Sequence, residues 1–409
     1  MMLPIYLYPI SFFLLFWFTK NKKNRIVYST LLITYLFSTI AAVFISTNKF
    51  IYGGVSSSWY AAIYHIFFTI VIILQFRNYD SSYYKQLLTI KNGSSFRIFT
   101  GIVLFLCLIS IFNNIQRVDF NLIMNDVHAL RGIVNENKEI SFIGYISFLA
   151  HQYTSVALAL MFYYIIKKPH KKFLILLLAF CSLTSLISSL QVAGREYLLK
   201  YLFLFFIAYS FTKSQLPGNW KRNLKNYFFV VAGFSLTLFV IISFLRFRYS
   251  SYASGASESD NTIYSLLSYF GQGWIYFSDV FMTFQKPLTP PGAINFPFFA
   301  SESISKNNLN DFINVEIYLN NFTTSLGSWV VDGGVVFGAI VAIIFSLILR
   351  FISKLKYNVF SLIYILWAFE FIFSYMFFFN DVFNTSRVAS IVLVVFFDII
   401  ERRTVKVNA

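Results

Sequence analysis

Residues 156–180 read VALALMFYYIIKKPHKKFLILLLAF, two long apolar runs joined by a gap that contains four lysines. The same alternation of apolar runs and polar gaps continues along the whole chain. A helix needs about 20 apolar residues to cross the hydrocarbon core of a membrane. The sequence therefore predicts an all-α, polytopic membrane protein. Its eleven candidate spans are 3–19, 26–46, 58–76, 98–115, 141–166, 173–191, 197–212, 227–245, 331–349, 358–379 and 384–400.

The composition also indicates a lipid environment. Hydrophobic residues make up 57% of the chain and charged residues 12%, whereas soluble domains average about 25% charged residues. The net charge of +16 would suggest nucleic-acid binding in a soluble protein. Here the basic residues gather in particular gaps, so we expect anionic lipid headgroups, and no nucleic acid, as their partner.

The basic residues predict the orientation of the chain. Alternate gaps and the C-terminal tail hold 22 of the 33 lysines and arginines, and such residues accumulate on the cytoplasmic side of a membrane. These gaps and the C-terminus are predicted to be cytoplasmic, and the N-terminus and the other gaps to lie outside. The 22 residues are Lys20, Lys22, Lys23, Arg25, Arg77, Lys85, Lys91, Arg97, Lys167, Lys168, Lys171, Lys172, Lys213, Lys221, Arg222, Lys225, Arg350, Lys354, Lys356, Arg402, Arg403 and Lys406.

One outer loop is much longer than the others and divides the chain. Residues 1–245 hold eight predicted spans, residues 246–330 form the loop, and residues 331–409 hold three spans and the tail. Within the loop, apolar residues of 263–284 recur on one face of a helix, opposite Ser265, Ser268, Gln272 and Asp279. We expect an amphipathic helix on the outer membrane surface or above a cavity. A span here would reverse the orientation of all that follows.

Several arginines lie on the predicted outer side, although basic residues generally prefer the cytoplasmic side. Guanidinium is a permanent, planar donor that binds phosphate in a bidentate manner, so these residues could bind a lipid diphosphate. The alternative is that these arginines only extend to the membrane interface or form local ion pairs. Local pairing is plausible beside Arg195, where Glu196 and Lys200 have the spacing of a helix salt bridge. The arginines are Arg131, Arg195, Arg246, Arg248 and Arg387.

Other polar residues give fewer indications of a functional site. His128 lies on the predicted outer side, where an imidazole could act as a general base. Glu370 and Lys200 fall within predicted spans and could line a tunnel or pair with one another. The chain has no Asp-x-Asp pair and no His-x3-His spacing, so we expect no metal. Its two cysteines, Cys107 and Cys181, are expected to be small core residues.

The stretch Asn321-Phe322-Thr323-Thr324, with Val331-Asp332-Gly333-Gly334 and Gly338 after it, carries a resemblance. It resembles the end of the large periplasmic loop and the start of the next span in bacterial O-antigen (oligosaccharide repeat-unit, Wzy-type) polymerases. There the pattern is Asn, an aromatic residue and Thr, then Asp-Phe-Gly and a further Gly; here Gly333 replaces the Phe. Gly194-Arg195-Glu196 looks like the family's short arginine turn. Leu130-Arg131-Gly132 lies where the family has its first arginine-bearing periplasmic loop.

The resemblance extends over the whole chain in its layout of spans and loops, and it implies a function. It implies a GT-C-like helical bundle in the bacterial inner membrane that polymerises glycan repeat units carried on undecaprenyl diphosphate. At the periplasmic face, the growing chain would pass from its lipid diphosphate to a sugar hydroxyl of the next unit. The implied partners are the lipid-linked donor and acceptor, membrane lipids, a chain-length regulator and a flippase.

Residue roles follow from the resemblance. Arginines would stabilise the charge of the departing diphosphate without a metal or other cofactor. Asp332 or His128, with Glu316 as a third candidate, would accept the proton of the sugar hydroxyl. Asp332 could equally be an N-cap of the helix that follows it. The implied catalytic residues are thus Asp332, His128 and Arg195, and the implied substrate-binding residues are Asn321, Thr323, Arg131, Arg246, Arg248 and Arg387.

Three other functions compete with polymerisation. An O-antigen ligase-like transferase has a similar layout and the same donor, and transfers a finished chain to another acceptor. A flippase or transporter of lipid-linked sugars usually has an even number of spans and no large outer loop. A structural membrane protein has no use for isolated arginines on the outer side.

The predicted orientation can be measured directly. Alkaline phosphatase fused after Ala300 should be active, because that enzyme works only outside the cytoplasm, and green fluorescent protein fused there should be dark. Fusions after His170 should give the opposite result. A fluorescent fusion after Ala300 would contradict the orientation.

Overall fold

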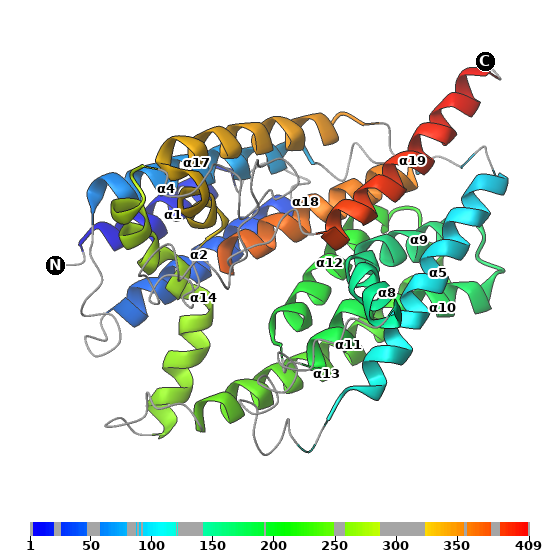
Figure 1. The fold of residues 1–409 in the computed structure, drawn as a ribbon, viewed down its shortest axis with the longest axis horizontal. Coiled ribbons are helices and arrows are strands. Elements are labelled where there is room, and N and C mark those ends of the chain that lie inside the picture. Colours follow the sequence, from blue (N-terminus) through cyan, green and yellow to red (C-terminus); the bar gives the residue numbers. More distant parts are fainter. Residues whose placement is uncertain are drawn as a thin grey trace. The chain divides into compact units, whose positions relative to one another are not determined.

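The computed structural model describes residues 3–19, 26–46, 58–79, 87, 90, 93–119, 121, 142–191, 194–248, 258–286, 324–355, 358–377 and 385–407. Within these residues all regular secondary structure is helical (Figure 1). The described residues of each predicted span lie mainly in one helix or in consecutive helical segments. Among the described residues, seven helical segments are long and apolar enough to cross a membrane, which supports a polytopic membrane protein. The number eleven stays a prediction.

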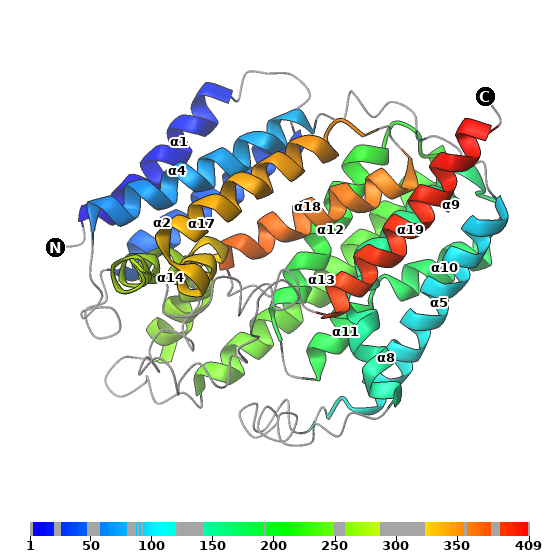
Figure 2. The ribbon, with the colours of Figure 1, turned by 45° about the horizontal axis from the view of Figure 1, so that its top comes forward.

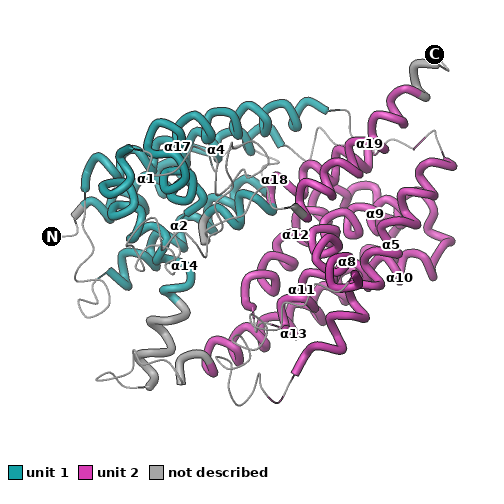
Figure 3. The backbone as a smooth tube through the Cα atoms, in the orientation of Figure 1, with its two compact units in different colours: residues 1–83, 263–355, 370–384 teal, residues 84–262, 356–369, 385–409 magenta. Residues whose placement is uncertain are grey.

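The seven segments are Ile26–Ser46, Trp59–Asn78, Gly93–Gln116, Phe142–Lys167, Lys172–Leu190, Gly218–Leu245 and Ser325–Ile352. Two further apolar helices, at Pro4–Thr19 and Val359–Tyr375, are shorter. The chain divides into two compact units (Figure 3). Unit 1 comprises Met1–Tyr83, Ile263–Leu355 and Glu370–Asn384, and unit 2 comprises Tyr84–Thr262, Lys356–Phe369 and Thr385–Ala409.

Unit 1 is built around α1 (Leu7–Thr19), α2 (Ile26–Ser46), α4 (Trp59–Gln75) and α17 (Ser325–Ile352). Helices α1, α4 and α17 lie side by side in Figure 2, and α17 packs along α4. The unit also contains the 3-10 turns η1 (Leu3–Tyr6) and η2 (Phe76–Asn78), most of α14 (Glu258–Thr283) and the end of α18 (Val359–Phe377).

The helix expected at 263–284 is present as α14, but its middle is buried in unit 1. The indole of Trp274 contacts the rings of Tyr8 and Tyr35, and its Nε1 donates to Ser38 Oγ at 2.7 Å. A Cβ atom at Gly271 would lie 2.5 Å from the backbone nitrogen of Ala42 in α2. Glycine therefore lets α14 approach α2 closely, and this packing buries the middle of the amphipathic helix.

Unit 2 surrounds α9 (Thr154–Lys167), in which every residue from Thr154 to Ile165 is buried. Its neighbours in contact are α5 (Gly93–Gln116), α10 (Lys172–Cys181) and α12 (Glu196–Thr212). Both cysteines are free and buried, as expected for core residues. The remaining elements are α8 (Phe142–Ala150), η3 (His151–Tyr153), α11 (Thr184–Leu190), α13 (Gly218–Arg248), α19 (Thr385–Val407) and the start of α18.

Two predicted spans of unit 2 are interrupted helices that contact each other where they break. The 3-10 turn η3 separates α8 from α9, and a turn at 182–183 separates α10 from α11. Ser185 Oγ donates to the carbonyl of His151 at 2.5 Å and lies 2.7 Å from Thr154 Oγ1. Hydroxyl groups can thus satisfy backbone groups that an interruption frees, which hydrocarbon could not do.

Candidate functional site

Helix α17 begins with the described part of the polymerase-like motif and is broken inside it. Thr324 is its N-cap, and the Thr324 hydroxyl accepts from the backbone N–H of Gly327 at 3.5 Å. Every residue from Ser325 to Gly334 is buried. Gly333 and Gly334 then leave helical geometry, and a second helical segment continues to Ile352. The motif is therefore a short, enclosed helix followed by a break.

The two glycines explain why the chain breaks at this point. Gly334 has φ 81° and ψ 176°, a conformation that is essentially confined to glycine. At Gly333, a Cβ atom would lie 2.5 Å from the ring of Phe337. Gly333 stands where the polymerase pattern has Phe, and the ring of Phe337 already occupies the adjoining space.

Asp332 is the last residue before the break, and its side chain is fully buried. Thr324 caps the first segment of α17, whereas Asp332 lies shortly before the second segment, so its role as the N-cap of that segment stays open. A break leaves carbonyls of the first segment and N–H groups of the second without partners along the helix. In secondary transporters, broken helices with such groups line the substrate and ion sites. An enclosed carboxylate here can accept a proton from a hydroxyl group or bind a cation.

A buried histidine anchors the start of the broken helix. His65 Nε2 lies 2.9 Å from Thr324 Oγ1, and His65 Nδ1 lies 3.1 Å from Tyr8 Oη. The imidazole stacks between Trp274 and Phe277, with ring centroids 4.7 and 3.9 Å away. In a neutral imidazole, one ring nitrogen donates a hydrogen bond and the other accepts one. The hydrogen bonds and ring stacking of His65 thus connect α1, α4 and α14 with the N-cap of α17.

The sequence alone did not point to His65 as part of this site. The available signal was a lone ionisable residue in an apolar run, which has a cost in the membrane and calls for a partner. The partners, Tyr8 and Thr324, are far away in the chain, so only the packing of unit 1 could identify them.

The second segment of α17 is held by α4. Tyr64 Oη donates to the carbonyl of Val335, directly after the break, at 2.6 Å. In the first segment, the Trp329 indole is fully buried and stacks parallel to the Phe371 ring at 5.9 Å. Both sides of the break are therefore fixed by side chains from other helices of unit 1.

Arg195 in unit 2 occupies the N-cap position of α12 and is 9% exposed. Its Nη1 donates to Ser243 Oγ of α13 at 3.0 Å, and its guanidinium lies 6.0 Å from the ring centre of Phe239. Just before it, the N–H of Gly194 bonds the carbonyl of Ser189 at 2.7 Å, which gives the tight turn that the sequence predicted. Arg195 therefore packs against α13 and does not extend to a surface.

The helix that Arg195 contacts leads toward two other predicted site residues. Arg246 and Arg248 end α13, and Arg246 follows Ser243 by three residues, about one helical turn. The side chains of these two arginines lie outside the described residues. Arg387 lies in the first turn of α19 in unit 2 and is half-buried.

The remaining predictions have different outcomes. Lys200 forms a helix salt bridge with Glu196 at 3.2 Å, which is one of the pairings that the sequence left open. Asp332 belongs to unit 1, whereas Arg195, Arg246, Arg248 and Arg387 belong to unit 2. Four site residues and one further candidate base lie outside the described residues: His128, Arg131, Asn321, Thr323 and Glu316.

No group of three or more His, Cys, Asp or Glu side chains that could hold a metal ion occurs in the described part of the chain. Comparisons of the chain with protein-family models, with curated proteins and with solved structures give no match. The case for a function therefore depends on the residues of this chain and on the resemblance of its motifs.

The break in α17 predicts a specific effect of Gly334→Ala. An alanine at φ 81° and ψ 176° would be strained by about 1–3 kcal/mol, so the purified variant should unfold at a lower temperature in detergent. Gly233→Ala is the matched control, because nothing lies within 4 Å of its Cβ position in α13. Equal thermal stability of the Gly334→Ala variant and the parent would contradict the break.

Proposed function

We propose that this chain is a membrane glycosyltransferase that polymerises polyprenyl-diphosphate-linked oligosaccharide repeat units at the outer face of the bacterial inner membrane. In this reaction the bond between the anomeric carbon of the donor chain and its diphosphate oxygen breaks. A bond forms between that carbon and a hydroxyl oxygen of the acceptor unit. The hydroxyl proton passes to a base, and the polyprenyl diphosphate leaves with the electron pair.

The observation that carries the proposal is the enclosed carboxylate at the break of α17. Asp332 is fully buried and stands in the motif that resembles the polymerases. Joining sugars in place of hydrolysing the donor requires that water be kept from the anomeric carbon. A base that is buried away from water fits that requirement, and we assign this role to Asp332.

Stabilisation of the leaving group is assigned to arginines, with Arg195 first among them. A guanidinium held in place before the reaction stabilises developing diphosphate charge without the cost of reorganising water. The hydrogen bond from Arg195 to Ser243 and the packing on Phe239 support such preorganisation. Arg131, Arg246, Arg248 and Arg387, with Asn321 and Thr323, are proposed to hold the donor and acceptor.

The same reaction chemistry also fits the O-antigen ligase-like alternative, which differs in its acceptor. A transporter of lipid-linked sugars is favoured by one particular observation, the broken helix itself. Interrupted helices that enclose an ionisable residue are frequent in transporters. Loss of a polymerase, a ligase and a flippase leaves different glycans: single repeat units on the surface, full-length chains that stay on the polyprenyl carrier, and repeat units that stay inside the cell.

Asp332→Asn keeps the size of the side chain and removes its basicity. In cells that depend on this chain, we expect the ladder of glycan lengths to collapse to a single repeat unit. The loss of a general base slows such reactions by about 10²–10⁴-fold. The measurement is gel electrophoresis of the surface glycan, together with the amount of protein in the membrane fraction.

Asp279→Asn, in α14 of the same unit, is the matched control and should leave the ladder intact, because Asp279 is only partly buried. A normal ladder from Asp332→Asn would overturn the assignment of the base. Accumulation of single repeat units inside the cell would favour the transporter.

Two substitutions test the role of Arg195: one changes its guanidinium group, and the other removes its hydrogen bond to Ser243. Arg195→Lys keeps the charge and loses the planar donor geometry, so chain lengthening should fall, by about 10²–10³-fold if Arg195 stabilises the leaving diphosphate. Ser243→Ala removes only the partner that positions Arg195, and we expect a smaller loss. If Arg195→Lys and even Arg195→Ala retain normal ladders, Arg195 is a packing residue.

A further inference from the structure

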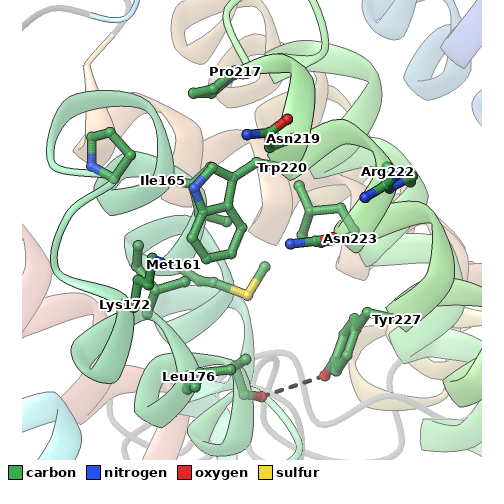
Figure 4. Close-up of a pocket in the computed structure, with 14 residues that line it drawn as sticks. Met161, Ile165, Lys172, Leu176, Pro217, Asn219, Trp220, Arg222, Asn223 and Tyr227 are labelled. Carbon is green, nitrogen blue, oxygen red and sulfur yellow. Dashed lines mark hydrogen bonds between the residues drawn. The ribbon is translucent and has the colours of Figure 1, made fainter.

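Unit 2 contains a cavity of about 680 Å³ between α9, α10 and the start of α13 (Figure 4). This volume lies in the range of small-molecule sites, about 300–1,000 Å³. All of its lining residues belong to the described part of unit 2. They include none of the residues assigned above to glycan transfer.

The cavity has an apolar floor and a polar, cationic rim. Met161, Ile165 and Ile175 line it and are buried. The rim is formed by exposed Lys172, Arg222, Asn219 and Asn223. Figure 4 shows Asn219, Trp220 and Asn223 of α13 opposite Lys172 and Met161. Such a site fits a molecule with a hydrogen-bonding anionic end and an apolar body.

In the described part of the chain, no carboxylate neutralises the charge of the rim. No carboxylate lines the cavity, and within the described residues neither Lys172 nor Arg222 has a carboxylate at ion-pair distance. The sequence contains no Asp or Glu from 140 to 195 or from 197 to 257, the segments that supply every lining residue. The cavity therefore favours an anion.

The apolar part of the cavity continues into a helix face suited to lipid. Leu176 lines the cavity and is 65% exposed, and Phe173 on the same helix is 80% exposed. Exposed apolar side chains of this kind on a polytopic membrane protein face acyl chains. Trp220, at the level of the polar rim, is a residue type enriched at membrane–water interfaces.

From this geometry we propose that the cavity binds the phosphate headgroup of an anionic glycerophospholipid, with an acyl chain along α10. Lys172 and Arg222 attract the phosphate, Asn219 and Asn223 donate hydrogen bonds, and Met161, Ile165 and Ile175 contact the start of the chain. Basic pockets between membrane helices on the cytoplasmic side are typical places for such headgroups. The predicted topology places this rim on that side.

The proposal is tested by lipid retention on the full-length protein. The protein is purified in mild detergent, incubated with phosphatidylglycerol or phosphatidylcholine, and examined by native mass spectrometry. We expect selective retention of phosphatidylglycerol. Removing two cations from the rim with Lys172→Gln and Arg222→Gln together should weaken retention by about tenfold or more.

Lys171→Gln with Lys225→Gln is the matched control. It removes the same charge from neighbouring positions that do not line the cavity, and both residues are exposed. This variant should retain phosphatidylglycerol like the parent. An equal loss in both double variants would mean diffuse attraction to a basic surface and would overturn the site.

A competition experiment distinguishes a lipid ligand from a soluble phosphate compound. Inorganic phosphate and glycerol 1-phosphate share the anionic group but have no acyl chain, so at millimolar concentration they should not displace phosphatidylglycerol. If either displaces it, or if phosphatidylcholine is retained equally well, the lipid assignment is wrong. None of these readouts depends on glycan transfer, so this proposal and the proposed function can fail separately.

Discussion

Hydrocarbon offers no hydrogen bonds to a polypeptide, and that constraint shapes this molecule throughout. A chain with 12% charged residues must pair its backbone groups within its own helices. The described regular structure is accordingly all helical. Wherever a helix is interrupted inside an apolar segment, other side chains have to serve the freed groups, and those places are where polar residues gather.

The interruptions of this chain follow that logic in both units. In unit 2, Thr154 and Ser185 join the breaks of two neighbouring helices. In unit 1, Tyr64 bonds the carbonyl just beyond the break of α17, while His65 holds its N-cap threonine. The breaks in unit 2 need only hydroxyl groups, and this fits a structural role. The break in α17 also encloses the carboxylate of Asp332, which costs free energy in such surroundings and therefore suggests a function.

The proposed glycan transfer and the proposed lipid site place different demands on charge. Transfer calls for an enclosed base and for guanidinium groups whose positions are fixed before the reaction, as Arg195 is by Ser243. Lipid retention calls for cations that remain exposed at the edge of an apolar cavity, as Lys172 and Arg222 do. Burial thus separates the two kinds of basic residue more clearly than their positions in the sequence do.

The helical character of the apolar segments, the arginine turn at Gly194 and the spacing of the salt bridge between Glu196 and Lys200 were predictable from the sequence. These features depend on local periodicity and spacing, which a chain carries without its partners. The burial of α14, the contacts of His65 with Tyr8 and Thr324, and the start of α17 at the Thr324 cap were not predictable. They arise from packing between segments far apart in the chain, such as Gly271 against Ala42. No local pattern encodes that contact, because only the folded unit brings the two backbones together.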